Sequence, residues 1–466
     1  MLLKNALSQF NNLQFMIENL NLKSTMGKRF LLESPMLFTS KEIEAELNLV
    51  EKAFINFEEK KDFFEKLQFK LSQLRDIKGS IKNIGNNLVL DDVELFEIKH
   101  FAMVVREIFN LQNEHQFQLS TISSLDEVVK ILDPNETNIP SFYIYDSFSA
   151  ELASIRKKIK LHKNTDVASD VEKNKDLDSL FLASEELEAS IRAALCSKLF
   201  KFHKNLENTL TNLAHLDVII AKAIQAKKMN LCKPSVSTSS TSYSLLFNPQ
   251  LKEVLQLQQK EFQPIDIQIY KSVCFITGAN MAGKTVVLKT VALCQYLFQF
   301  GFFVPAEKAE IAIVDKIMIS IEESQSEYKG LSSFASEMIK VNAMVEEAIK
   351  GNNVLILIDE LARTTNPVEG RAIVNAVATI FYENNVRSLI TTHYSKLSGQ
   401  CRKLRVKGLD TNIATADINQ NNINNFIDYS LIEDEVGDTP HEALRVCTIL
   451  GINPEIIKKA QNELKN

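Results

Sequence analysis

Apolar residues recur at three- and four-residue steps in the first half of the chain, most regularly over 43–74, with Glu and Lys between them. This spacing predicts amphipathic helices. We therefore expect residues 1–232 to form an almost entirely helical domain. Pro and Asn turn signals interrupt the pattern at 133–149, and the polar stretch 164–180 is typical of a connecting loop. The helical pattern resumes over 182–228.

Short apolar runs bounded by polar turns distinguish the second half of the chain. The runs lie at 273–276, 311–314, 354–358 and 388–391, and helical stretches alternate with them at 285–300, 333–350 and 368–382. Such alternation predicts a mostly parallel sheet covered by helices on both faces, which is the α/β class. The Ser/Thr-rich segment 235–244 fits either a linker or a short edge strand.

The composition is that of a globular protein with more than one domain. The chain has 466 residues, and at about 150 residues per domain it should hold roughly two to four domains. Apolar residues make up 45% and charged residues 24%, which excludes a mostly disordered or fibrous chain. With 13 Gly and 10 Pro there are few turn-formers, so long helices are expected.

The sequence predicts a cytoplasmic protein without a membrane partner. No apolar run approaches the length of about 18 residues that a membrane span needs, and the N-terminal segment does not resemble a signal peptide. The six Cys are scattered without CxxC or metal-ligand spacing, as is usual for reduced thiols. The net charge of −6 means that any nucleic-acid binding must depend on a local basic patch.

The densest basic patch is a short helical segment. It contains Arg156, Lys157, Lys158, Lys160 and Lys163. Five fixed positive charges so close together are able to neutralise phosphates, which would give salt-sensitive DNA binding that is independent of sequence. A solvated helix face has the same composition, and this alternative stays open.

A phosphate-loop motif of the Walker A type is the most specific feature of the chain. The segment Gly278-Ala279-Asn280-Met281-Ala282-Gly283-Lys284-Thr285 has the pattern G-x-x-x-x-G-K-[ST] and lies between a predicted strand and a predicted helix. Glycines allow backbone N–H groups to surround phosphate oxygens at the helix N-terminus. We expect Lys284 to contact the β- and γ-phosphates, Thr285 to ligate Mg²⁺, and Val286 to complete the nucleotide site.

Polar residues end two of the predicted strands in this half. The run 354–358 leads directly into Asp359 and Glu360, and the run 388–391 leads to His393. Asp359 suits the coordination of Mg²⁺, and Glu360 suits the polarisation of an attacking water. His393 is expected beside the γ-phosphate, at the edge where the strands of an α/β sheet end. We therefore predict Lys284, Glu360 and His393 as catalytic residues.

These motifs, in this order and spacing, resemble those of the MutS family of mismatch-repair ATPases. The matching segments are 276–293 for the phosphate loop, 330–338 for the signature loop, and 355–372 and 388–397 for the later ATPase motifs. In the helical half, the segments 24–35, 146–156 and 216–223 resemble the Smr-bearing MutS paralogues most. The resemblance extends over nearly the whole chain.

The resemblance implies a multidomain fold. An all-α core and lever domain over 1–232, with its clamp reduced or absent, would precede a P-loop ATPase domain of the ABC type over 233–466. ATP and Mg²⁺ would be the cofactors of a homodimer in which Ser332 of the signature loop reaches the nucleotide of the partner subunit. The C-terminal helices 439–466 resemble a dimerisation segment, although a helix pair capping its own domain fits equally well.

The chain also departs from the family pattern. Ala279 stands where Pro is usual, and Ala362 and Thr364 replace glycines after the Asp-Glu pair. We expect the chain to lack a mismatch-recognition segment before residue 20 and an Smr domain after residue 466, and 156–182 is too short for a DNA-embracing clamp. We expect ATP chemistry to be retained and the reading of mismatches to be lost.

Three functions are compatible with these features. The first is a MutS-related ATPase that couples nucleotide hydrolysis to the binding of double-stranded or structured DNA. The second is a chaperone-like ATPase that remodels a protein client, such as a cobalamin-dependent amino-acid aminomutase. The third is a nucleotide-binding interaction protein with little turnover, which the presence of Glu360 disfavours.

Overall fold

The computed structural model describes residues 1–163, 171–278, 283–321, 333–394, 397, 400–409, 426–434 and 442–463. These residues divide into two compact units. One combines Met1–Asn19, Pro35–Glu51 and Gln225–Asn466, and the other combines Leu20–Ser34 and Lys52–Ile224. The chain is thus multidomain, and the domain boundary at 232/233 stays a prediction.

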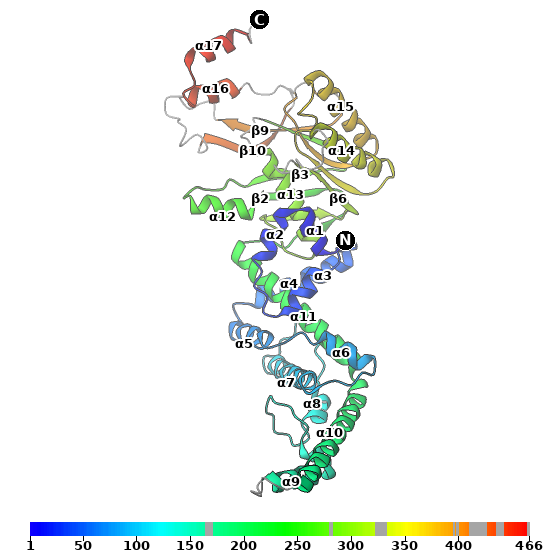
Figure 1. Cartoon of the computed structure of the whole chain (residues 1–466). Helices are drawn as coiled ribbons and strands as arrows, with labels where there is room; N and C mark the ends of the chain where they lie inside the picture. Colours follow the sequence, from blue (N-terminus) through cyan, green and yellow to red (C-terminus); the bar gives the residue numbers. More distant parts are fainter. Residues whose placement is uncertain are drawn as a thin grey trace. The chain divides into compact units, whose positions relative to one another are not determined.

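The second unit is helical, as the apolar spacing predicts (Figure 1). Its described helices are α3 (Thr25–Glu33), α5 (Lys61–Ser72), α6 (Lys78–Gly85), α7 (Asp92–Glu114), α8 (Asp126–Leu132), α9 (Ala150–Lys163) and α10 (Val171–Phe200). Two further helices, α4 (Ser40–Asn56) and α11 (His203–Met229), contribute residues to both units. The turn signals around 133–149 coincide with a break between α8 and α9 that holds one short 3-10 helix, η1 (Asp146–Phe148).

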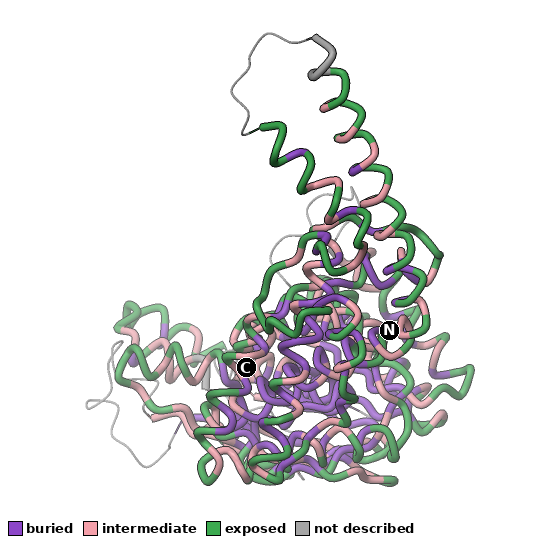
Figure 2. Tube along the Cα trace, turned by 90° about the horizontal axis from the view of Figure 1, so that it is seen from below, coloured by how far each residue is buried: buried purple, intermediate pink, exposed green. Residues whose placement is uncertain are grey.

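The expectation of a loop over 164–180 is wrong in its second part, since α10 begins at Val171. Residues 171–180 include one Glu, two Lys and two Leu, which are good helix formers even in a polar segment. The charged side chains of Lys175, Asp176 and Asp178 lie on an exposed surface of this helix. Residues 164–170 lie outside the described part of the chain. Helices α9 and α10 contact each other, and both are exposed over much of their length (Figure 2).

A buried carboxylate joins two helices of this unit. Asp217 on α11 accepts hydrogen bonds from the backbone N–H of Ser24 at 2.8 Å and from its hydroxyl at 2.7 Å. Ser24 in turn caps α3 by accepting from the N–H of Gly27 at 3.0 Å. A Cβ on Gly27 would lie 2.5 Å from Asp217 Oδ2, so only glycine allows this approach. Burial raises the pKa of Asp217, against the effect of these donors.

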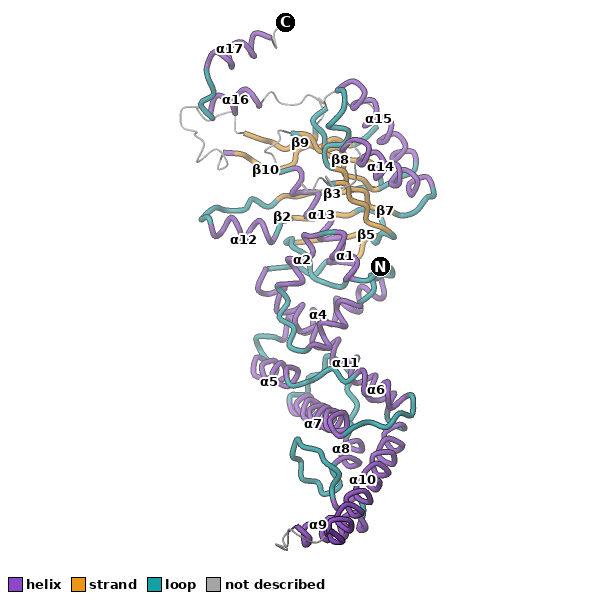
Figure 3. The backbone as a smooth tube through the Cα atoms, in the orientation of Figure 1, coloured by secondary structure: helices purple, strands orange, loops and turns teal. Residues whose placement is uncertain are grey.

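The first unit holds all the described strands, in two sheets (Figure 3). The larger sheet has the order β10-β9-β4-β8-β7-β6 and is parallel except for the β9–β10 pair. Its strands are β4 (Val273–Thr277), β6 (Lys316–Ser320), β7 (Val354–Ile358), β8 (Arg387–Thr391), β9 (Arg402–Leu409) and β10 (Ile427–Glu433). The predicted parallel sheet is confirmed for the runs 273–276, 354–358 and 388–391, whereas the assignment of the run 311–314 to it is wrong, because the strand Lys308–Ala312 pairs in the smaller sheet.

The smaller sheet was not foreseen from the sequence. Its order is β1-β5-β2-β3, with β1 (Ser235–Ser237), β2 (Thr241–Leu246), β3 (Ile265–Ile269) and β5 (Lys308–Ala312). The Ser/Thr-rich segment 235–244 therefore forms strands. Of the two alternatives for this segment, the strand is confirmed and the linker is wrong. Helix α12 (Pro249–Leu257) lies between β2 and β3 in the chain.

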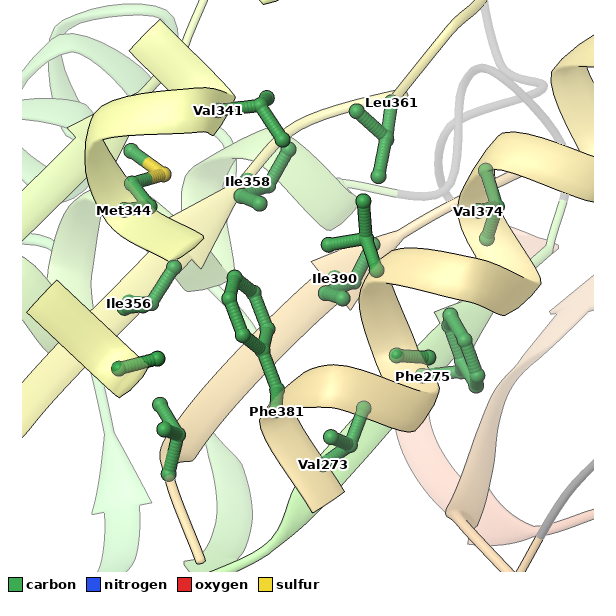
Figure 4. Packing of buried hydrophobic residues seen from close by; sticks show 14 of the residues in the cluster. Val273, Phe275, Val341, Met344, Ile356, Ile358, Leu361, Val374, Phe381 and Ile390 are labelled. Atoms are coloured by element: carbon green, nitrogen blue, oxygen red, sulfur yellow. The ribbon is translucent and has the colours of Figure 1, made fainter. Parts of the chain in front are cut away.

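Helices cover the larger sheet as the alternating pattern predicts. Helix α13 (Lys284–Gln299) contacts β6, β7 and β8, whereas α14 (Ser333–Ile349) and α15 (Pro367–Glu383) form a core with β4, β7 and β8. Alternate strand side chains such as Phe275, Ile356 and Ile390 pack with Phe381 in this core (Figure 4). Because both faces are covered, β7 is buried along its whole length, which explains its unbroken apolar sequence.

Both chain ends add helices to the first unit. Helices α1 (Leu3–Gln9) and α2 (Asn11–Glu18) come from the segment that was expected to belong to the helical half, and the ring of Phe10 stacks on Tyr296 of α13. At the other end are α16 (Glu442–Ile449) and α17 (Pro454–Glu463), and Val446 and Ile449 pack against Leu409 of β9. A dimerisation role for these helices stays a prediction.

No helix among the described residues is long and apolar enough to cross a membrane.

Candidate functional site

The ends of three parallel strands form the candidate site. Strands β4, β7 and β8 are neighbours in the sheet, and their carboxyl ends lead to Gly278, Asp359 and Thr392. Adjacent parallel strands end at the same edge of a sheet. The edge therefore gathers the residues that the sequence motifs single out, although the motifs lie far apart in the chain.

The phosphate-loop glycines have backbone conformations that other residues rarely adopt. Gly278 has a φ of 137°, and Gly283, directly before α13, has a φ of 72°. Glycine lacks the Cβ that disfavours such angles, which explains why the motif needs it at both ends. Residues Ala279, Asn280, Met281 and Ala282 lie outside the described part of the chain.

Lys284, the first residue of α13, is almost completely buried, with 4% of its surface exposed. Its Nζ donates a hydrogen bond of 2.7 Å to the carbonyl oxygen of Gly278 across the loop. Burial lowers the pKa of Lys284, and the nearby carboxylates of Glu360 and Asp359 act in the opposite direction. A desolvated ammonium in this position is a strong binding group for an anion.

Asp359 is held in place by two hydroxyl groups. Thr285 donates to Asp359 Oδ2 at 2.6 Å, and Thr391 of β8 donates to Asp359 Oδ1 at 2.5 Å. The Asp359 N–H bonds to the carbonyl oxygen of Ser320 at 2.8 Å. The predicted metal ligands Thr285 and Asp359 are therefore adjacent. Thr391 lies within the motif 388–397, but no role was predicted for it from the sequence.

The residues present fit a magnesium ion. Among the residues that the structure describes, no group of three His, Cys, Asp or Glu is arranged to hold a metal. Mg²⁺ does not need such a group, because it is commonly bound by one or two protein oxygens together with phosphates and waters. The hydroxyl of Thr285 and the carboxylate of Asp359 are donors of this kind.

Glu360 occupies a tight turn beside this pair. Its N–H donates to Thr391 Oγ1 at 2.9 Å, and its φ is 47°. Its carboxylate is mostly shielded from solvent and pairs with the guanidinium of Arg363 at 2.7 Å. The carboxylate also influences the pKa of both Lys284 and His393, so all three predicted catalytic side chains belong to one electrostatic site.

His393 lies just beyond the end of β8 and is exposed. Desolvation lowers its pKa, and the positive charges of Lys284 and Arg363 add to this effect, whereas Glu360 opposes it. The neutral imidazole is therefore favoured at physiological pH. Its ring lies against Tyr394, with 4.4 Å between ring centroids.

A cavity of about 390 Å³ opens beside the phosphate loop. Gly283 and Val286 of the predicted nucleotide site line it, together with apolar residues of α12 and with Tyr429 of β10. A Cβ on Gly283 would lie 3.3 Å from the ring of Tyr429, so the aromatic ring lies directly against this glycine. Gln263 holds that strand by accepting from the Tyr429 N–H at 2.9 Å.

Sequence motifs did not indicate the residues of this cavity wall. The cavity wall combines separate elements that share no characteristic spacing in the sequence, and its residues include Leu251, Gln263 and Tyr429. Ser332, predicted to reach a partner's nucleotide, lies outside the described residues. Its role stays a prediction, as do the roles of the other site residues.

Comparisons with known proteins agree with the motifs. Residues 274–466 match the family model of MutS domain V. Endonuclease MutS2 of Caldicellulosiruptor saccharolyticus is 34% identical over 216 residues, which cover 46% of this chain and 26% of that protein. Endonuclease MutS2 of Caldanaerobacter subterraneus subsp. tengcongensis is 24% identical over 454 residues, 83% of this chain and 56% of that protein. DNA mismatch repair protein MutS of Rickettsia akari is 33% identical over 217 residues, 46% of this chain and 24% of that protein. The chain thus spans between 24% and 56% of the length of these relatives.

Proposed function

We propose, on the premise that this chain belongs to the MutS family, that it is an ATPase whose nucleotide cycle controls binding to DNA. The proposed catalytic unit is the part of the chain that matches MutS domain V and carries the phosphate loop. ATP is the proposed substrate and Mg²⁺ the proposed cofactor. The working form is proposed to be a homodimer.

One observation carries the ATPase proposal. Thr285, from the phosphate-loop helix, lies 2.6 Å from Asp359, which follows a different strand of the sheet. A phosphate-binding loop alone would support nucleotide binding. Its direct contact with the Asp-Glu pair supports hydrolysis, because it brings phosphate-binding, metal-binding and water-polarising groups together.

Each side chain has a defined task in this proposal. The ammonium of Lys284 neutralises the β- and γ-phosphates, and its burial strengthens that attraction. The carboxylate of Glu360 orients the attacking water and accepts its proton. Thr285 and Asp359 would hold Mg²⁺, which would supply positive charge to the phosphate oxygens. His393, favoured in its neutral form, offers a hydrogen bond near the γ-phosphate.

The cavity beside Gly283 is suited to the base of the nucleotide. Its lining is largely apolar and includes the ring of Tyr429, which offers a stacking face. Its position next to Val286 means that a nucleotide with its phosphates on the loop would direct its base there. This adds a binding element that the phosphate-loop motif alone does not supply.

The proposed coupling to DNA derives from the relatives and from one surface. The relatives include proteins named endonuclease and DNA mismatch repair protein. The exposed lysines of α9 give the helical unit a positively charged surface. Contacts from this surface to phosphates would not distinguish base sequences. The chaperone-like alternative stays a prediction without support from these relatives.

Two substitutions test the ATPase proposal by separating binding from turnover. Lys284→Met should abolish ATP binding, because the neutralising charge is lost while the side-chain volume is retained. Glu360→Gln should retain binding and slow hydrolysis by roughly 10²- to 10⁴-fold, since an amide cannot accept the proton. Binding would be measured with a fluorescent ATP analogue and turnover by phosphate release.

The matched control is Glu383→Gln, which makes the same change at an exposed residue of α15. It should leave both binding and hydrolysis unchanged. Equal hydrolysis by the wild type and Glu360→Gln would remove Glu360 from the reaction. Failure of the wild type to hydrolyse ATP would contradict the proposed activity.

A further inference from the structure

The turn that carries Glu360 contains two residues in the left-handed region. Glu360 has a φ of 47° and Ala362 a φ of 59°. A residue with a Cβ adopts this conformation at a cost in free energy. Ala362 is completely buried, as is Leu361 before it. Such a turn persists only where its surroundings fix it.

Two side chains fix the backbone of Ala362. Its N–H donates to Glu337 Oε1 at 3.0 Å, and its carbonyl oxygen accepts from the hydroxyl of Tyr394 at 2.8 Å. Glu337 belongs to α14, and Tyr394 follows β8. The two are close to each other, since Glu337 contributes to raising the pKa of Tyr394, after the larger effect of burial.

Helix α15 has a glycine where it passes the hydrogen bond between Tyr394 and Ala362. A Cβ on Gly370 of α15 would lie 2.1 Å from Tyr394 Oη and 2.9 Å from the carbonyl oxygen of Ala362. Glycine at 370 therefore makes room for the tyrosine hydroxyl to reach the turn. Residues from α14, α15 and the end of β8 thus converge on one backbone position.

We propose that Glu337 and Tyr394 are positioning residues for Glu360. They hold Ala362 in its left-handed conformation, and the turn then presents the Glu360 carboxylate in one direction. A hydrogen bond of 3.2 Å from the N–H of Arg363 to the carbonyl oxygen of Glu360 spans Ala362 and links the two ends of the turn. The inference rests on the proposed ATPase function.

Two substitutions, each of which removes one hydrogen bond to Ala362, measure the effect on turnover. Glu337→Ala removes the acceptor of the Ala362 N–H, and Tyr394→Phe removes a single hydroxyl. Each should lower kcat roughly tenfold, the effect of losing one buried hydrogen bond in the arrangement of the reacting groups. The KM for ATP should change little, because the phosphate loop is untouched.

A rescue experiment distinguishes positioning from general stabilisation. Glycine adopts positive φ readily, so in an Ala362→Gly background the turn depends less on its side-chain contacts. The loss of kcat caused by Glu337→Ala should then shrink to about twofold or less. An equal loss in both backgrounds would overturn the proposal.

Matched controls are available on the same elements. Glu346→Ala deletes an exposed carboxylate from α14, and Tyr382→Phe deletes an exposed hydroxyl from α15. Both should retain the kcat of the wild type. Unchanged kcat in Glu337→Ala and Tyr394→Phe would also overturn the proposal.

Amide hydrogen exchange tests the contact without any need for turnover. The N–H of Ala362 should exchange faster in Glu337→Ala than in the wild type, and faster than in Glu346→Ala. Equal exchange in all three would contradict the role of Glu337 even in a chain without ATPase activity. Absence of turnover in the wild type, by contrast, would contradict the proposed function alone.

Discussion

At the scale of single residues, the candidate site is organised around one buried positive charge. Lys284 is 4% exposed, and its Nζ donates a hydrogen bond to the neutral carbonyl oxygen of Gly278. Desolvation outweighs the attraction of Glu360 and Asp359, so its pKa is lowered. The charged lysine therefore costs the folded chain stability, which binding of an anion would offset.

This balance predicts that Lys284→Met stabilises the protein in the absence of nucleotide. The lowered pKa of Lys284 means that the protonated form is less favourable in the folded than in the unfolded chain, because only the folded chain must bury the charge. We expect a higher Tm by calorimetry, with roughly 2–4 °C for each kcal/mol gained. Lys289→Met, the same change at a half-buried position of α13, is the control. A lower Tm in Lys284→Met would contradict the argument.

The pH dependence of this difference follows from the sign of the shift. Between the lowered pKa of Lys284 and its ordinary value of 10.5, the unfolded chain binds a proton that the folded chain has lost. Stability of the wild type therefore rises with pH through that window. The Tm advantage of Lys284→Met should accordingly shrink as the pH approaches 10.5. A Tm difference that does not change with pH would show that the stabilisation by Lys284→Met does not come from removal of the buried charge.

At the scale of elements, helix α9 carries two kinds of positive charge: one that is used in ion pairs within the protein, and others that are exposed to solvent. Arg156 is engaged, since it donates to Asp146 at 2.6 Å and to Glu188 at 3.0 Å. Lys157, Lys158 and Lys160 are exposed, and the described residues offer them no ion pair. The basic patch read from the sequence is therefore smaller than its five residues suggest.

We predict that these three lysines account for DNA binding by the helical unit. Replacing all three by Ala should weaken binding to duplex DNA and make the slope of log K against log salt about 3 units less steep. Fluorescence anisotropy over a salt series measures both effects. The triple replacement of the exposed Lys198, Lys201 and Lys204 by Ala is the control. Equal loss in the two triple variants would assign the effect to net charge rather than to α9.

Patterns that are local in the sequence predicted their elements closely. The run 354–358 became β7 with the same bounds, and the phosphate-loop helix begins one residue before its predicted start at Thr285. Apolar alternation and glycine spacing are properties of consecutive residues, so one sequence suffices to detect them.

Contacts between residues that are far apart in the sequence could not be predicted from such local patterns. Glu337 precedes Ala362 in the chain and Tyr394 follows it, yet both bond to its backbone. Thr391 likewise bonds to Asp359 on the neighbouring strand's end. Each of these residue types is common in helices and strand ends. Their partners depend on how the elements pack, which the spacing of apolar residues does not specify.

At the scale of the whole molecule, the sequence pattern also did not predict which segments group into the same compact unit. Residues 1–19 are helical, as predicted, yet they group with the unit of the sheets rather than with the helical unit. An amphipathic pattern indicates that one face of a helix is buried but not against which domain. The stacking of Phe10 on Tyr296 supplies that information.

Assembly gives the last prediction, which is that two chains share each nucleotide site. One chain supplies Lys284, Thr285, Asp359 and Glu360, and the resemblance assigns Ser332 of the partner subunit to the γ-phosphate. Mixing a Lys284→Met chain with a Ser332→Ala chain should therefore restore part of the ATPase activity, because each mixed dimer retains one site with both residues intact. Each variant alone should stay inactive, since ATP would favour the closed dimer only where both contacts form. Absence of recovery, in samples where native mass spectrometry detects mixed dimers, would show that each chain completes its own site.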